Sequence, residues 1–432
     1  MSVNATSSFD DSVALPEAMR EEESWVSQST LLLYLGSAFL LGVLNQFSIR
    51  MVGLMPVDEI LLCGLIGHAM LWLIVARRLP AAVPAPRILA VLLVCQVVAF
   101  AGYMVSDLWR ESLPGDMLRG WSRMLFLAVD ICGFSLLFGA SNRAFVALQV
   151  GLIFSFVGSF VSGPLFGDYW KFAFAFPVTL AVLLGVPRWL GYRAAIGVCI
   201  ALGILHSLMD FRSLGGVCLL LGGLLVLRQL APAARKLTLI AMLLLALGIS
   251  PWVGRWIFSD TGERATRSNV ERSAMLQAAW EGFLKSPVLG NGSWFSNSHV
   301  MDEFLIIRTQ NARMAGVGGF AEDDADGMAI HSQILVALAE GGIFGATFFF
   351  AYGLLLLWGI WFCLTDAPWE WTLPVRLFVL LIAFWNLLMS PFSGTHRVEI
   401  AVAVGLLLML WRQRTLLQNL DLSQIACDPC PA

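Results

Sequence analysis

Charged residues are scarce in this sequence of 432 residues: Asp, Glu, Lys and Arg together make up 13% of it. Hydrophobic side chains make up 58%, and the mean hydropathy is +0.77. This composition excludes an ordinary soluble domain. Uncharged apolar runs long enough to cross a bilayer recur along most of the chain. We therefore predict an all-α polytopic membrane protein, with membrane lipids as its surroundings and no nucleic acid as partner.

Cysteine is missing from the longest polar stretch, so no disulfide framework is expected to hold that stretch together. Six of the eight cysteines fall within or at the edge of apolar runs, and the other two form Cys427-Asp-Pro-Cys430 near the C-terminus. One CxxC pair without a second is typical of an unstructured tail rather than of a zinc site. No cleavable signal peptide is visible, and residues 1–29 are polar and acidic, as in a disordered tail.

The apolar runs predict twelve membrane spans. An even number places both termini on one side of the membrane. The connections and the C-terminal tail on that side hold more arginines than the short connections on the other side, which predicts that both termini are cytoplasmic. The predicted spans lie near residues 30–48, 57–76, 88–107, 121–139, 144–163, 170–186, 191–208, 213–227, 237–257, 343–362, 373–391 and 398–411.

The chain therefore divides into five parts. A tail (1–29) precedes spans 1–9 (30–257), and a large outer loop (258–342) is followed by spans 10–12 (343–411) and a second cytoplasmic tail (412–432). The region 163–227, with short helices and tight turns, is where the span count is least fixed. Asp58-Glu59 opens the second span on the outer side, either as a helix N-terminal cap or as carboxylates with a chemical role.

The outer loop contains an amphipathic segment. Apolar residues at 275, 276, 279, 280, 283 and 284 recur at helical spacing, and Lys285-Ser-Pro287 ends the pattern. Such a helix lies on the membrane or packs over the mouth of the bundle. The acidic run at 322–327 departs from the calcium-loop pattern at its first and twelfth positions, so we predict a solvated loop, with no metal.

His331 stands where the outer loop returns to the membrane. The apolar stripe of Ile330, Ile334 and Leu338 predicts a short interfacial helix that ends at Gly341-Gly342. The next twenty residues carry no charge and predict a span. An ionisable group at the boundary of water and lipid suits either a chemical role or a structural one at a helix end.

Several of these motifs together resemble the O-antigen ligase and polymerase superfamily of bacterial inner-membrane proteins. The resemblance is carried by an arginine (Arg272), an aromatic residue (Trp280), the turn Pro287-Val-Leu-Gly290-Asn-Gly292, and His331-Ser-Gln followed by Leu338-Ala-Glu340-Gly-Gly342-Ile-Phe-Gly345. Asp210-Phe-Arg212-Ser213 is similar to the Ser-Arg-Gly motif of the family. The agreement covers residues 205–350; the N-terminal half agrees in hydropathy alone.

The resemblance implies a GT-C-like membrane glycosyltransferase with its active site on the periplasmic side, in lipopolysaccharide or exopolysaccharide biosynthesis. It would move a glycan from undecaprenyl pyrophosphate to an acceptor hydroxyl, on another glycan or on the lipid A core, without metal or cofactor. The sequence departs from the family at Ser332, where Asn is usual, and at Gly167-Asp168, where Asn-Pro-Asn is common. These departures leave the preferred substrate open.

The chemistry of such a transfer assigns a role to each candidate residue. His331 is the candidate general base, because its ordinary pKa is close to neutrality. Arginines stabilise a leaving pyrophosphate by bidentate hydrogen bonds, which makes Arg212 and Arg272 the first candidates for the phosphate site. Each also has a purely structural interpretation: Arg212 as an anchor at the end of a span, and Arg272 as one partner of a surface ion pair. Further candidates at predicted outer ends are Lys171, Arg397 and His396, with Ser332 and Glu340 in supporting roles.

Two other functions are compatible with a polytopic chain. A flippase or other transporter for lipid-linked oligosaccharides is typically built from two repeated halves with charged residues at mid-membrane, and no repeat is visible in this sequence. An intramembrane protease would require a histidine partner for Gly139-Ala-Ser141 on a suitable span, and none is found. Among glycosyltransferases, ligase, polymerase and protein-glycosylating activities stay open.

Overall fold

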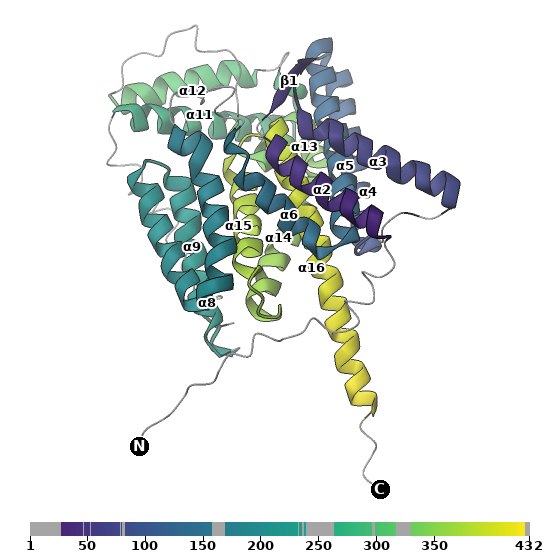
Figure 1. Cartoon of the computed structure of the whole chain (residues 1–432). Helices are drawn as coiled ribbons and strands as arrows, with labels where there is room; N and C mark the ends of the chain where they lie inside the picture. Colours follow the sequence, from purple (N-terminus) through teal and green to yellow (C-terminus); the bar gives the residue numbers. More distant parts are fainter. Residues whose placement is uncertain are drawn as a thin grey trace.

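Helices make up nearly all of the part of the chain that the structure describes. The computed structural model describes residues 27–45, 47–51, 53–77, 79, 83–157, 169–231, 233–235, 237–238, 263–295, 299–316 and 330–427. Its one sheet within these residues is an antiparallel hairpin of two short strands, β1 (Ser48–Met51) and β2 (Gly53–Pro56), with Ser48 opposite Pro56. The hairpin was not predicted. The fold is otherwise the predicted all-α bundle (Figure 1).

Among the described residues, six helices are long and apolar enough to cross a membrane, which makes this a multi-pass membrane protein. They are α3 (Val57–Ala76), α4 (Pro86–Arg110), α5 (Pro114–Ala140), α8 (Ala175–Leu208), α14 (Thr347–Thr365) and the apolar part of α16 (Gly394–Cys427). Shorter apolar helices are α2 (Gln28–Leu44), α6 (Asn142–Ile153), α13 (Gln333–Gly345) and α15 (Leu373–Met389). The count of twelve spans stays a prediction, and the predicted span 237–257 lies almost wholly outside the described residues.

Helix α8 is two antiparallel helices joined at Gly191. The backbone of Gly191 has φ 76°, a conformation that favours glycine and interrupts the helical path. Thr179 Oγ1 lies 2.8 Å from His206 Nε2, although a straight helix would separate residues 27 positions apart by about 40 Å. The chain therefore folds back on itself, as the predicted spans 170–186 and 191–208 require. Helix α9 (Arg212–Arg228) then packs against this pair.

One end of the bundle, here called the tail end, is rich in arginine. Arg228 and Arg235 donate hydrogen bonds to backbone carbonyls at the end of α14, with Arg228 Nη2 2.5 Å from Ala367 O. Arg376, near the start of α15, pairs with Glu370 at 2.9 Å. These arginines are among those that predict the cytoplasmic side.

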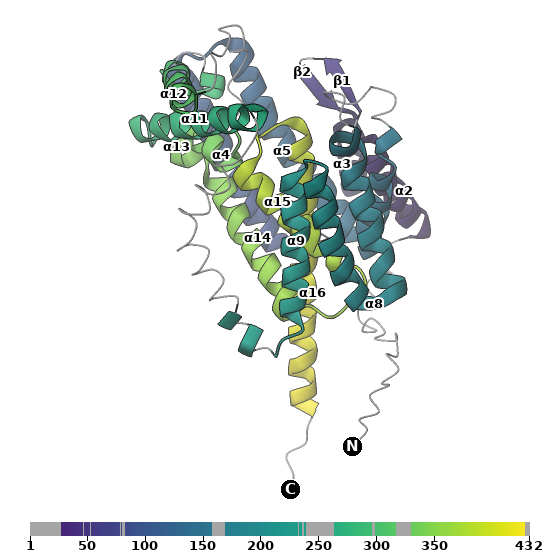
Figure 2. The same ribbon diagram turned by 90° about the vertical axis from the view of Figure 1, so that its left-hand side faces the viewer.

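The opposite end, here called the head end, carries two helices that lie across the bundle, α11 (Glu263–Lys285) and α12 (Val300–Met314), together with the hairpin (Figures 1 and 2). As predicted, α11 ends at Lys285, just before Ser286-Pro287. The face of α11 that is buried in the protein covers only part of the predicted apolar stripe. Ala274, Met275, Ala278 and Ala279 are buried, whereas the predicted Trp280 and Leu284 are 49% and 58% exposed. The buried face packs on α12, a helix that the sequence did not predict.

Helices α2 and α6 approach each other closely because glycines face each other across the contact. A Cβ atom on Gly151 would lie 2.1 Å from the Phe39 carbonyl oxygen, and one on Gly42 would lie 2.4 Å from the Leu148 carbonyl oxygen. Small residues at helix contacts are a usual means of packing helices within membranes. The pair α2–α6 therefore depends on the absence of side chains at these two positions.

We predict that Gly151→Leu destabilises the fold, whereas Gly36→Leu on α2, where a Cβ meets no atom within 4 Å, does not. Overpacking a tight contact costs roughly 1–3 kcal/mol. Thermal unfolding of the detergent-purified proteins measures the difference. Equal midpoints for the two variants would show that the α2–α6 contact is not tight.

Candidate active site

His331 lies at the head end, immediately before helix α13. The helix begins at Gln333, and its N-cap is Ser332, whose Oγ accepts a hydrogen bond from Leu335 N at 3.3 Å. The sequence predicted that His331 is part of the interfacial helix. In the structure it lies instead in the bend before that helix, and its side chain is half-buried. The Ser332 hydroxyl is engaged by the helix cap, which gives this residue a structural function.

The surroundings of His331 favour its neutral form. Burial, and to a smaller extent the positive charge of Arg272 and the nearby His396, together lower the pKa of His331 to about 4. At neutral pH the imidazole is therefore uncharged. An uncharged imidazole has one nitrogen free to accept a proton or a hydrogen bond.

The two groups that act on His331 come from distant parts of the chain. Arg272 is an exposed residue on α11, and His396 is half-buried near the start of α16. The Nδ1 atom of His396 lies 2.7 Å from Ser393 Oγ, a hydrogen bond that restrains its ring. Three of the predicted site residues, His331, Arg272 and His396, thus share one place at the head end.

A turn after α11 fits into a break in α13 and fixes the two helices together. Gly342 has φ 64°, and a Cβ there would lie 2.2 Å from the Val288 carbonyl oxygen. A Cβ on Gly290, with φ 72°, would lie 2.2 Å from the Glu340 carbonyl oxygen. Both positions therefore exclude any residue other than glycine. Backbone hydrogen bonds cross the contact, from Gly292 N to Glu340 O at 3.0 Å and from Ile343 N to Pro287 O at 2.9 Å.

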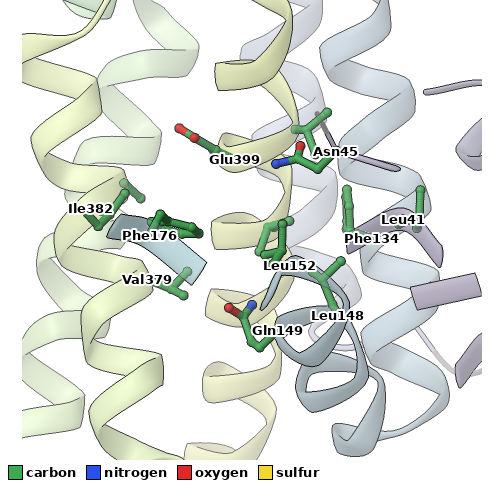
Figure 3. A pocket seen from close by; sticks show the side chains of 13 residues that line it. Leu41, Asn45, Phe134, Leu148, Gln149, Leu152, Phe176, Val379, Ile382 and Glu399 are labelled. Carbon is green, nitrogen blue, oxygen red and sulfur yellow. The ribbon is translucent and has the colours of Figure 1, made fainter. Parts of the chain in front are cut away.

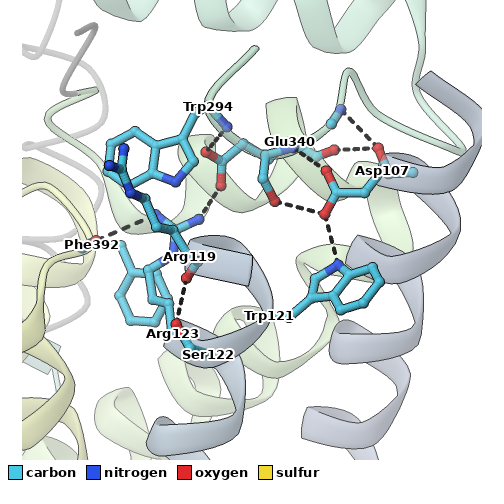
Figure 4. Close-up of polar contacts among 11 residues, drawn as sticks. Asp107, Arg119, Trp121, Ser122, Arg123, Trp294, Glu340 and Phe392 are labelled. Atoms are coloured by element: carbon cyan, nitrogen blue, oxygen red, sulfur yellow. Dashed lines mark hydrogen bonds and ion pairs between the residues drawn. The ribbon is translucent and has the colours of Figure 1, made fainter. Parts of the chain in front are cut away.

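Glu340 holds this turn from within (Figure 4). Its Oε1 accepts a hydrogen bond from Trp294 N at 3.0 Å, and its Oε2 accepts one from the guanidinium of Arg123 on α5. Both side chains are almost fully buried, and the guanidinium also lies within 6 Å of the rings of Tyr103, Trp294 and Phe392. Glu340 therefore has the structural contacts expected of it, now with a charged partner.

Asp107 on α4 secures the far side of the same turn. Its carboxylate accepts hydrogen bonds from Ser293 N at 2.6 Å, Ser293 Oγ at 2.9 Å and Trp121 Nε1 at 2.8 Å (Figure 4). Ser106, the preceding residue, accepts from Gly292 N and donates to Glu340 O. Helices α4, α5 and α13 thus all hold the segment that connects to α11. This framework fixes α11, which carries Arg272, against α13, the helix that His331 precedes.

The other predicted phosphate ligands lie in different places. Lys171 Nζ lies 5.9 Å from the centre of the Phe211 ring, and Arg212 forms an exposed pair with Asp210 at 3.4 Å. These two cations therefore share the turn where α9 begins. Because α9 ends at the arginine-rich tail end, this turn lies toward the head end.

Arg397, the residue after His396 in the first turn of α16, is buried at the head end. Its Nε donates to Glu59 Oε1 at 3.1 Å, and Nη2 also bonds this oxygen. Arg397 is 8% exposed and Glu59 fully buried. Of the pair Asp58-Glu59 at the start of α3, Glu59 is therefore the buried partner of Arg397 on α16, and the phosphate-binding role of Arg397 stays a prediction.

Sequence reasoning missed Arg123 and Asp107, which organise the site. Arg123 stands only two residues inside the predicted span 121–139, and a charge at that depth was the available signal. Its partner Glu340 lies 217 residues away, so no local pattern pairs them. The acidic run 322–327 and Gly167-Asp168 lie outside the described residues. Within the described part, no group of three or more His, Cys, Asp or Glu is arranged to hold a metal ion.

Comparison with known proteins places the chain in no group: no family model matches it, and no curated protein matches it.

We predict that Arg272→Gln raises the pKa of His331 toward the ordinary value near 6.5, because it removes a nearby positive charge. Nitrogen-15 NMR of histidine-labelled protein, with His331→Gln identifying the signal, follows the titration. The control Arg313→Gln alters an exposed arginine on α12 and should leave the pKa unchanged. An unchanged pKa of His331 in Arg272→Gln would show that Arg272 has no electrostatic effect on His331.

We also predict that Arg123→Met and Glu340→Met each destabilise the protein by about 3–5 kcal/mol, because each leaves one buried charge without its partner. The double variant should recover much of this loss, since two apolar side chains then replace the pair. Thermal unfolding of the four proteins measures the coupling. Strictly additive losses would mean that the two side chains do not depend on each other.

Proposed function

We propose that this protein is a membrane glycosyltransferase of the O-antigen ligase and polymerase type. It would move a glycan from undecaprenyl pyrophosphate to an acceptor hydroxyl on another glycan or on the lipid A core, at the periplasmic face of a bacterial inner membrane. The observation that carries the proposal is the half-buried His331 at the head of a membrane bundle, within electrostatic reach of Arg272 on α11. The order of sequence motifs supports the same function.

In the proposed reaction, the acceptor oxygen forms a bond to the anomeric carbon as the bond to the pyrophosphate oxygen breaks. The acceptor proton passes to the free nitrogen of His331, which must be uncharged beforehand. Undecaprenyl pyrophosphate leaves with the bonding electrons. Arg272 is suited to its negative charge, because a guanidinium donates two parallel hydrogen bonds to a phosphate.

The low pKa of His331 fits this order of events. Before the donor binds, the positive charge of Arg272 contributes to keeping His331 unprotonated. A bound pyrophosphate would offset that charge and raise the pKa of His331, so the histidine becomes a better base when the donor is present. His396 lies where it can relay the proton or orient the acceptor. Lys171 and Arg212 are candidates for binding the donor farther along the head end.

A lipid-linked oligosaccharide flippase is the second candidate function, and one feature of the bundle favours it. Asp130 lies on α5, fully buried, with no hydrogen-bond partner for either carboxylate oxygen, and it interacts electrostatically with Glu59, Arg397 and Asp58. Buried ionisable groups inside the bundle are typical of transport pathways. In a flippase, Asp130→Asn would abolish function while His331→Ala would not.

We predict that His331→Ala and Arg272→Ala each reduce glycan transfer by about 10²-fold or more, the usual scale for a lost proton-transfer group or charge-stabilising group. The assay is restoration of surface polysaccharide in a mutant that lacks the gene for this chain, analysed on gels. Arg313→Ala, on exposed α12, is the matched control and should restore it fully.

The chain-length profile then identifies the reaction. Accumulation of free lipid-linked polymer indicates a ligase, and accumulation of single repeats indicates a polymerase. Full restoration by His331→Ala at normal expression would overturn the assignment of the site.

A further inference from the structure

A partly open pocket, here called the cavity, lies among the helices of the bundle (Figure 3), and neither His331 nor Arg272 is among its lining residues. It lies among α2, α5, α6, α8, α15 and α16. Ten of its thirteen lining residues are apolar, among them Phe134, Phe176 and Ile382. Space lined in this way suits a hydrocarbon chain.

Gln149 indicates that the occupant is more than a hydrocarbon. Its side chain lines the cavity, is fully buried, and has no hydrogen-bond partner for either its amide nitrogen or its oxygen. A buried amide left in this state costs about 1–3 kcal/mol. Buried polar groups in native proteins nearly always have a partner, so an amide without one marks a place for a polar group from outside the chain.

Two other polar side chains line the cavity with Gln149. Asn45 follows the end of α2, and Glu399 lies on α16, where its Oε2 accepts a hydrogen bond from Asn386 Nδ2 at 2.6 Å. Figure 3 shows Asn45, Gln149 and Glu399 around the same space. Together they offer amide donors, amide acceptors and a carboxylate.

The charges of the lining exclude an anionic ligand. None of the thirteen lining residues is Lys, Arg or His, and the single ionisable one is Glu399. A phosphate in this space would lack any cation and would face a carboxylate in a medium of low dielectric. The pyrophosphate of a lipid-linked donor therefore does not belong here.

We propose that this cavity binds an uncharged amphiphile, a single hydrocarbon chain that carries hydroxyl groups of the kind found in a monoacylglycerol. The chain packs against the apolar lining, and the polar group bonds to Gln149 and Asn45, with a hydroxyl donating to Glu399. This site does not depend on the proposed glycosyl transfer.

The location of the cavity connects it with the head end. Glu399 follows His396 by three residues on α16, which is less than one helical turn, and the two side chains interact electrostatically. His396 in turn acts on His331. The polar group of the amphiphile therefore lies against the same part of α16 that carries His396.

The test uses the full-length protein in nanodiscs of phosphatidylethanolamine and phosphatidylglycerol. A monoacylglycerol with a diazirine in its chain is cross-linked by light, and the labelled residues are mapped by mass spectrometry. We expect labels on lining residues of α6, α15 and α16. Unlabelled 1-monooleoylglycerol should compete, and lysophosphatidic acid with the same chain should compete at least about tenfold less well, because of its negative charge.

Two variants of the lining test the two parts of the site. Gln149→Leu should reduce labelling about tenfold, the effect of losing one buried hydrogen bond. Ala383→Phe, which fills the cavity without altering its polar groups, should abolish labelling. Leu354→Phe, on the exposed face of α14, is the matched control and should label like the unaltered protein.

Equal labelling of Ala383→Phe, or labels found mainly outside the lining, would overturn the site. Equal competition by lysophosphatidic acid would overturn its preference for an uncharged ligand. Thermal unfolding of each variant establishes that it is folded, and if Gln149→Leu is not, Ala383→Phe alone decides.

Discussion

The buried carboxylate of Glu340 is the contact on which the head end of this protein depends. It accepts hydrogen bonds from Arg123 on α5 and from the backbone of Trp294, so one side chain joins the bundle to the segment after α11. A carboxylate removed from water is tolerated only with such partners, which makes the position of each partner specific. The glycines at 290 and 342 then allow the turn and α13 to touch through their backbones.

This framework places functional groups that the chain order keeps apart. Arg272 comes from α11, His331 from the bend before α13, and His396 from the start of α16. The turn Pro287–Gly292 and the break in α13 at Gly341-Gly342 therefore have a structural role and not a chemical one. Their motif residues hold α11 against α13, and the histidine stays uncharged because of burial and the adjacent guanidinium. Chemistry and scaffold are divided between different residues of the same motifs.

The parts of the fold that could be predicted were those that depend on residues close together in the sequence. Hydropathy located the helices, Pro287 located the end of α11, and the pair of spans at 170–186 and 191–208 anticipated the reversal at Gly191. Non-local features were missed. The hairpin rests on pairing between short strands. Helix α12 was also missed, although Val300, Phe304 and Ile307 recur at helical spacing. The pairs Arg123–Glu340 and Glu59–Arg397 join residues 217 and 338 positions apart, which no window of sequence can show.

The most direct test of glycosyl transfer uses purified protein in nanodiscs with an undecaprenyl-pyrophosphate-linked glycan and an acceptor glycan or lipid A core. The measurement is the release of undecaprenyl pyrophosphate alongside the glycosylated acceptor. We predict that the two products appear in equal amounts, and that His331→Ala forms neither. Movement of intact lipid-linked glycan across the bilayer without cleavage, at the same rate in His331→Ala, would contradict the account and identify a transporter.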